Sequence, residues 1–215
     1  MKFLLLLTIL LPSFAVSINA SEDEPEEAMK RIDLRWASKP LTVTMNAQQS
    51  RIANFARTFA QEYTEYTPNE KLVTYLANPA AYVPGHSHYY VEEDSRNGYL
   101  KVDLTYQMDY MTEFCYWRRP NGHSLVGIVL RVGYEGERAE GLCLFYDYNP
   151  TTGILTPDLK VKRAVDQVIA RHPGNSVYVF LPQQGKDISI HFVHWDPEED
   201  FVTIEEELKW KGNGF

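Results

Sequence analysis

Histidines are the first residues in this sequence whose spacing could support metal chemistry. His86 and His88 lie one residue apart in a Pro- and Gly-containing stretch, a spacing found in some zinc sites. No third ligand is indicated, so a solvated loop is the favoured interpretation and no metal is expected. His191 and His194 are three residues apart in an expected strand, so they point to opposite faces and are poorly placed to share a metal.

Nucleophilic and cofactor chemistry has little support. The sequence contains no GxSxG turn, no Walker A loop and no dinucleotide-binding fingerprint, so no cofactor is expected. Cys115 and Cys143 sit among apolar neighbours in expected strands, where burial makes a thiol unreactive.

Carboxylates offer the alternative of acid–base catalysis. Glu113 is expected on the same inner sheet face as Cys115, where a carboxyl needs a partner or a raised pKa. Asp147 falls on the same face, near a strand end. With His123, these acids are the candidates for a secreted hydrolase, which requires an acid within hydrogen-bond reach of a histidine. Whether the protein is an enzyme stays open.

Aromatic residues are the most suggestive feature, because the chain contains 14 tyrosines. Tyr116, Trp117, Tyr146 and Tyr148 are the candidate ligand-binding residues. In the expected register, the three tyrosines lie on the sheet face opposite the Val- and Ile-rich stripe of the middle strand. Such a face could bind a glycan or a peptide. The other interpretation is that the helix expected at 47–63 covers these tyrosines.

Export is the firmest expectation for the N-terminus. Residues 1–20 carry Lys2, a largely apolar run at 3–11 and a small-residue cleavage pattern ending at Ala20, typical of a cleavable signal peptide. The apolar run is much shorter than the ~20 residues of a membrane span. A periplasmic, cell-surface or secreted location is therefore expected, with no membrane span in the mature chain.

Charge and length define the rest of the chain. The formal net charge of -8 disfavours nucleic acid and anionic membranes as partners. Residues 21–40 begin with five acidic side chains around a proline and are expected to be a solvated leader or linker. Residues 41–215 are long enough for a single domain with its own core.

Periodicity within that domain predicts an α+β fold, with N-terminal helices packed on a largely antiparallel sheet. Apolar residues at helical spacing predict a helix at 47–63, with Asn46 as its N-cap, and another at 70–76. Alternation and turn pairs predict strands from residue 89 onward. The later elements are a three-stranded meander over 108–148, a helix or strand at 159–170, a hairpin over 177–193 and a final strand within 201–210.

Turn chemistry gives the expected pairing of the meander. Cys115 is placed opposite Val126, and Cys143 opposite Leu130, so the two cysteines lie on the outer strands with the middle strand between them. Outer strands are about 9–10 Å apart, and a disulfide needs Cα atoms within about 7 Å. Two buried free thiols are therefore expected, although export would permit a bridge.

Four segments of the chain resemble uncharacterised exported proteins of Bacteroidetes-type bacteria. They are CYWRRPNGHSLV at 115–126, FYDYNP at 145–150, LTP at 155–157 and LPQQGKDI at 181–188. The resemblance implies a bacterial envelope setting and carries no activity or site residues.

The leading hypothesis is therefore a non-catalytic binding or interaction module of the cell envelope or exterior. Its partner would be a glycan, a peptide or an envelope protein. The hydrolase is the alternative, and a structural subunit with a large exposed apolar patch is a third possibility.

Overall fold

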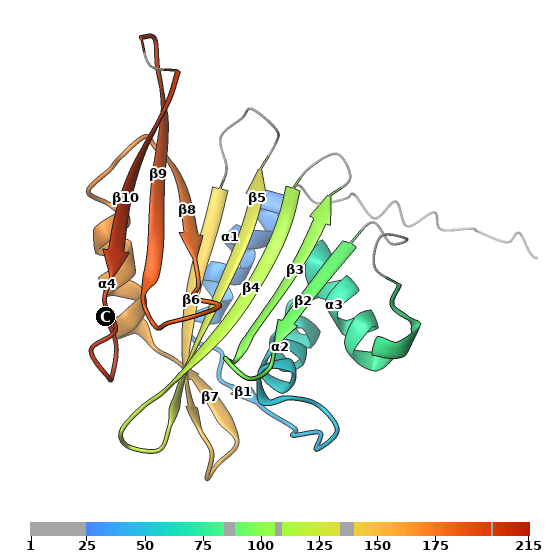
Figure 1. Cartoon of the computed structure of the whole chain (residues 1–215). Coiled ribbons are helices and arrows are strands. Elements are labelled where there is room, and N and C mark those ends of the chain that lie inside the picture. The colour runs from blue at the N-terminus through green and yellow to red at the C-terminus, as the bar shows by residue number, and fades with distance from the viewer. Residues whose placement is uncertain (1–24, 84–88, 106–108, 134–139, 199) are drawn as a thin grey trace, which may run out of the picture.

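The computed structural model describes residues 25–83, 89–105, 109–133, 140–198 and 200–215, and it confirms the α+β class (Figure 1). A seven-stranded antiparallel sheet has the order β1-β7-β6-β5-β4-β3-β2, and a second, three-stranded sheet has the order β10-β9-β8. The strands are β1 Leu41–Thr42, β2 Tyr89–Asp94, β3 Tyr99–Thr105, β4 Asp109–Arg118, β5 Ser124–Gly133, β6 Glu140–Asn149, β7 Ile154–Pro157, β8 Ser176–Phe180, β9 Ile188–Asp196 and β10 Asp200–Leu208. Because β2 to β7 follow one another in space as in sequence, the expected meander is present and extended.

The helices of the described chain are short. They are α1 Pro25–Trp36, α2 Arg51–Glu62, α3 Thr67–Ala77, the 3-10 helix η1 Pro79–Ala81 and α4 Leu159–Ile169. Within the described ranges, no helix combines the length and apolar character needed to cross a membrane.

Helix α2 is the centre of the first core. Its apolar side chains, including Ile52, Phe55 and Phe59, are fully buried against one face of the seven-stranded sheet. The helix begins later than expected because Ser50, and not Asn46, is the N-cap: its hydroxyl accepts a hydrogen bond from the Ala53 N–H at 3.1 Å.

The expectation of a solvated leader at 21–40 is wrong for residues 25–36, which form α1. Ala28, Met29, Ile32 and Trp36 are buried in the same core as α2. These four residues have helical spacing, and the first-turn acids Glu26 and Glu27 favour the positive end of the helix dipole. The acidic residues at this position therefore mark the start of a helix and not a solvated leader. Residues 1–24 lie outside the described ranges.

The register of the meander differs by one residue from the expected pairing. Cys115 pairs with Gly127, and Cys143 pairs with Val129. At the β4–β5 turn, Gly122 adopts a positive φ of 83° and the loop holds one residue more than assumed, so pairing starts at Arg118 and Ser124. A shift of one residue exchanges the faces of a strand relative to its neighbour.

The two cysteines are buried free thiols, as expected. They lie on β4 and β6, with β5 between them. Burial is the main cause that raises the pKa of Cys115 to about 12 and also raises the pKa of Cys143. Both thiols are therefore protonated and unreactive at neutral pH.

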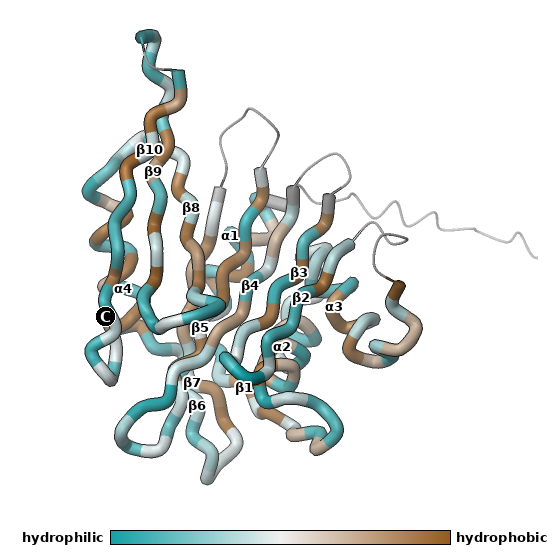
Figure 2. Tube along the Cα trace, in the orientation of Figure 1, coloured by the Kyte–Doolittle hydropathy of each residue, from teal (hydrophilic) through white to brown (hydrophobic). Residues whose placement is uncertain are grey.

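The opposite face of the seven-stranded sheet carries a second core. Helix α4 and the inner side of the three-stranded sheet pack here, through Val165, Ile190 and Phe192 among others. Figure 2 shows the hydrophobic stretches of β4 and β5 that separate the two cores, and a β10 that is hydrophilic over much of its length. The β8–β9 connection, residues 181–187, reaches back to the first sheet: the indole N–H of Trp117 donates to the Lys186 carbonyl at 2.8 Å.

Candidate functional site

The aromatic residues expected to form a binding face are in the protein interior. Tyr146 is 0% and Tyr148 4% exposed, and both pack against helices. The Tyr146 ring meets Trp36 of α1 edge-on at 6.0 Å, and the Tyr148 ring meets Phe55 of α2 at 4.8 Å. The prediction that this face is open is wrong, and the other interpretation, that a helix covers it, describes the structure.

Tyr116 and Trp117 are on opposite faces of β4. Tyr116 is partly buried and its ring packs on Phe55 at 5.8 Å. Trp117 is 4% exposed and stacks on Trp210 at 5.8 Å in the second core. The one-residue register shift places Tyr116, Tyr146 and Tyr148 on the same face as the apolar stripe of β5, and this stripe is the floor of the first core.

Glu113 shares the face of Cys115, as expected, and anchors the β8–β9 connection. Its carboxylate accepts hydrogen bonds from the Tyr99 hydroxyl and the Leu181 N–H, each at 3.0 Å. The side chain is buried, and burial raises its pKa despite the lowering effect of these two donors. Glu113 therefore joins the first sheet to the segment that leaves β8.

His123 and Asp147 do meet. The His123 Nδ1 lies 2.6 Å from Asp147 Oδ2, and the other Asp147 oxygen accepts from Arg119, which also binds Asp158 at 2.6 Å. Asp147 thus orients a histidine whose second ring nitrogen carries no hydrogen bond to a described residue. Glu113 takes no part, because its register partner is Val129, whereas Asp147 pairs with Leu125 four residues earlier on β5.

A cavity of about 310 Å³ lies beside this charge cluster. Its polar lining includes Arg119, Asp158, Lys160 and Lys211, and its apolar lining includes Phe215. Neither His123 nor Asp147 lines it, so the cavity does not deliver a ligand to the His–Asp pair.

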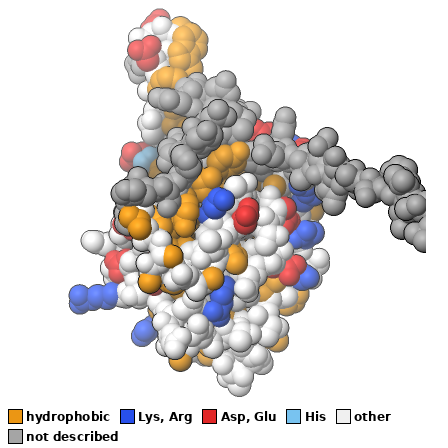
Figure 3. Space-filling view, turned by 90° about the vertical axis from the view of Figure 1, so that its right-hand side faces the viewer, with side chains coloured by type: hydrophobic (Ala, Val, Ile, Leu, Met, Phe, Trp, Pro, Cys, Tyr) orange, Lys and Arg blue, Asp and Glu red, His pale blue; other side chains and the backbone are white. Residues whose placement is uncertain are grey.

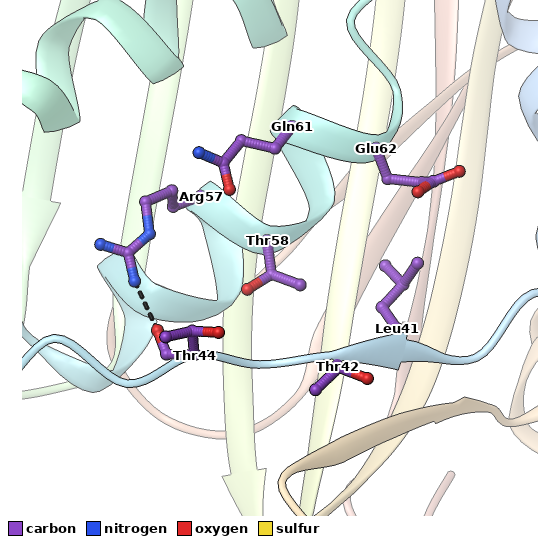
Figure 4. A pocket seen from close by; sticks show the side chains of 7 residues that line it. All are labelled: Leu41, Thr42, Thr44, Arg57, Thr58, Gln61 and Glu62. Carbon is purple, nitrogen blue, oxygen red and sulfur yellow. Dashed lines mark hydrogen bonds between the residues drawn. The ribbon is translucent and has the colours of Figure 1, made fainter.

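A smaller groove of about 230 Å³ separates α2 from the segment that contains β1 (Figure 4). Arg57 points across it to the Thr44 carbonyl at 2.5 Å and also binds Gln49 and Asn54. Glu62 pairs with Lys39 at 3.0 Å. The charged side chains of the groove, Arg57 and Glu62, therefore already have partners that hold α2 in place.

Metal chemistry gains no support within the described ranges, where no group of three or more His, Cys, Asp or Glu side chains could hold an ion. His191 and His194 lie on opposite faces of β9, and His191 contacts the Ser189 hydroxyl at 2.9 Å. His86 and His88 fall outside the described residues.

An open aromatic sheet face does exist, on the second sheet. The inner side of this sheet is buried at Val179 of β8 and along β9, whereas Ile204 on the same side of β10 is 38% exposed. The outer side faces away from α4. We call this outer side the aromatic face; it consists of Tyr178, Phe180, Ser189, His191, Val193, Trp195, Phe201, Thr203, Glu205 and Glu207, which pair across the three strands. At its root, the Arg131 guanidinium lies over the rings of Tyr178 and Phe180, at 5.4 and 5.3 Å from their centroids. This contact fixes the aromatic face to β5.

The far end of the aromatic face projects from the body of the protein (Figure 1). β8 pairs with β9 only as far as Val193, whereas β9 and β10 continue to Asp196 and Asp200. On this projecting hairpin, Trp195 and Phe201 are cross-strand partners and are 64% and 63% exposed. Figure 3 shows hydrophobic and acidic side chains together on its tip. Two large exposed aromatic side chains at one position of a hairpin are typical of a contact surface.

Charge is concentrated on the same hairpin. Residues 188–208 contain seven acidic residues and no Lys or Arg. The whole chain has 29 acidic and 21 basic residues, so the remainder holds 22 and 21 and is nearly neutral. The acidity of this protein is therefore a property of the β9–β10 hairpin.

The sequence predicted strands in this region but did not indicate that Trp195 and Phe201 are exposed on them. The available signals were the absence of Lys and Arg over 188–208 and the position of Trp195, which is out of phase with the alternating Ile188, Ile190 and Phe192. What the pattern could not show was that no helix covers the outer side of the hairpin. No protein-family model, curated protein or solved structure matches the chain.

Proposed function

We propose that this chain is an exported, non-catalytic interaction module that docks on a basic partner protein through the aromatic face. The carrying observation is the exposed Trp195–Phe201 pair on a projecting hairpin that holds nearly all of the net negative charge. Exposed aromatic side chains supply contact area at low cost in side-chain entropy. The surrounding carboxylates select a partner with complementary positive charge.

The charge distribution distinguishes between classes of partner. A second copy of this chain would bring two hairpins of seven acidic residues together, which is unfavourable. Anionic lipid and nucleic acid are disfavoured for the same reason. A partner surface with an apolar pocket bordered by Lys or Arg fits both features of the hairpin.

Export is part of this proposal, because residues 1–20 have the composition of a signal peptide. Intact mass of the chain recovered from the cell envelope or medium tests it. Loss of the first 20 residues is the expected result, and a full-length chain confined to the cytoplasm contradicts it.

The docking proposal is tested with a displayed random-peptide library selected on immobilised protein. The selected peptides should combine Lys or Arg with large apolar residues. They should bind the double variant Trp195→Ala/Phe201→Ala about 1,000-fold more weakly, since aromatic hot spots contribute about 2 kcal/mol or more each and about 1.4 kcal/mol is a factor of ten. The matched control is Leu34→Ala on α1, which removes another exposed apolar side chain, 81% exposed.

Three outcomes would contradict the proposal. Peptides that bind the double variant as well as the wild type would place the site elsewhere. Binding to vesicles of neutral lipid that requires Trp195 would indicate a membrane surface. Selective binding on a glycan array, with the same requirement, would indicate a sugar.

A hydrolase remains a second candidate because of one observation, the 2.6 Å contact between His123 and Asp147. In this function, His123 would act as a general base oriented by Asp147. A panel of ester, amide and glycoside substrates should then show turnover that Asp147→Asn lowers by about 10²-fold or more. Activity unchanged by this substitution, or no turnover of any substrate, would remove the candidate.

A further inference from the structure

The outer edge of β10 is an unpaired strand edge beside the aromatic face. β10 is the last strand of its sheet, so its backbone groups on one side have no strand partner in the described chain. Its nine residues match β9 one to one, from Asp200 opposite Asp196 to Leu208 opposite Ile188. A regular edge of this length can accept another strand.

We infer that the partner presents an extended basic segment, which adds to this edge as a fourth strand. The inference rests on the proposed function and specifies the conformation in which the partner binds. Side chains of an added strand would alternate between the two sides of the sheet, as those of β10 do. The residues on the aromatic face would lie beside Phe201, Thr203, Glu205 and Glu207 in turn.

This register defines a sequence pattern. Basic residues two apart would face Glu205 and Glu207, whose side chains are 69% and 55% exposed. Glu207 also pairs with Lys209 at 2.6 Å, so a basic residue of the added strand would share this carboxylate with Lys209. An apolar residue four positions from the nearer basic residue would face Phe201, next to Trp195. The segment therefore has a period of two, with basic residues at one end and an apolar residue at the other.

Charge on β10 disfavours pairing of this edge with the same edge of a second copy. Charged side chains are a common means by which edge strands avoid self-association. Glu205, Glu206 and Glu207 would meet the same acids of a second copy in a parallel pair, and an antiparallel pair would still join two acidic strands. Glu206 already pairs with Arg171 and His172 on the inner side of the sheet. Glu205 and Glu207, on the aromatic face, are therefore the residues that would attract a basic segment to this edge.

The probe is a seven-residue peptide written for antiparallel pairing, with Lys at its first and third positions, Val at the fifth, Leu at the seventh and Thr between. Its reversed sequence serves for parallel pairing. Binding to the full chain is followed by amide chemical shifts. Shifts should appear along β10, and the variant Glu205→Lys/Glu207→Lys should bind the peptide at least about tenfold more weakly. That variant should instead bind a peptide with Glu in place of Lys.

Backbone participation is tested by methylating the peptide nitrogens one at a time. A methyl group on a nitrogen that faces β10 should weaken binding at least about tenfold, and one that faces solvent should leave it within about twofold, so losses alternate along the peptide. Equal effects at every position, or no binding of either peptide, would overturn the inference. The proposed function would survive that result if library peptides still required Trp195 and Phe201.

Discussion

The two sheets of this protein use aromatic residues in opposite ways. In the seven-stranded sheet, Tyr146 and Phe114 are fully buried and meet the helices above them. In the three-stranded sheet, Trp195 and Phe201 stand on a face that no described helix covers. The same residue class therefore stabilises the fold in one sheet and is available for binding in the other. The two roles differ because helices cover one sheet face and not the other, and not because the faces differ in aromatic content.

The largest expected effect comes from removing an aromatic side chain of the covered sheet face. Phe59 is 0% exposed and its ring packs on Tyr63, Phe114 and Tyr146. Phe59→Ala should lower the free energy of unfolding by about 3–5 kcal/mol, since it leaves a cavity. Urea denaturation followed by circular dichroism measures this.

The matched variant in the second sheet is Trp195→Ala. Because Trp195 is 64% exposed, the free energy of unfolding should change by less than about 0.5 kcal/mol. A loss of several kcal/mol there would mean that the hairpin is part of the core, and the comparison between the sheets would fail.

A smaller effect is expected where the two layers meet at Gly127. A Cβ atom built at this position would lie 2.9 Å from the Trp117 ring and 3.3 Å from the Phe145 ring. Gly127→Ala should therefore cost about 1–3 kcal/mol of stability through overpacking. In the background of Trp117→Leu, which removes the nearer ring, the cost should fall, and a double-mutant cycle measures this coupling. Additive losses would show that the rings do not limit the space.

The last effect is a pH dependence at Glu113, which joins the two sheets. Burial raises its carboxyl pKa above the ordinary value of 4.5, so the folded state binds the proton more tightly than the unfolded state. The resulting stabilisation is complete below about pH 4.5 and is lost as the pH rises through the folded-state pKa.

Glu113→Gln removes this titration. Its amide can accept from the Leu181 N–H and donate to the Tyr99 hydroxyl oxygen, so the contacts of the carboxyl are kept. Chemical denaturation at several pH values above 4.5 should show the wild type losing stability relative to the variant. Parallel pH profiles of stability for the wild type and the variant would refute a raised pKa of Glu113. The control is Glu198→Gln, on the exposed hairpin turn.

Local pattern predicted most elements of the fold. The helical spacing through Phe59 and the turn pairs between strands indicated α2 and the meander, because both signals depend on residues close in sequence. The helix α1 was missed because five acidic residues suggested a solvated leader, while its buried face has only four apolar residues. Net charge is a sum over all residues of a segment, whereas the burial of a helix depends only on the residues of one of its faces.

The sites could be predicted less well. The sequence suggested that Asp147 and His123 lie near one end of the sheet, and they do meet. It placed the tyrosines of the meander on the face opposite the apolar stripe of β5, because the expected β4–β5 and β5–β6 pairings were each displaced by one residue. A displacement of one residue reverses the faces of a strand pairing. The β4–β5 error therefore changed the interpretation of Tyr116, and the β5–β6 error changed that of Tyr146 and Tyr148.

Sequence alone determined most of the secondary structure after α1, the unpaired state of two cysteines and the concentration of acidic residues over 188–208, because these depend on composition and on neighbours along the chain. Tertiary structure decided which aromatic face is open. Helices α1 to α3 come from the first third of the chain and cover a sheet formed by residues far from them, whereas the outer side of β9 and β10 has no such cover among the described residues. Covering a face is a long-range packing event that minimises exposed apolar area, and a strand's own pattern does not record which of its faces will be covered.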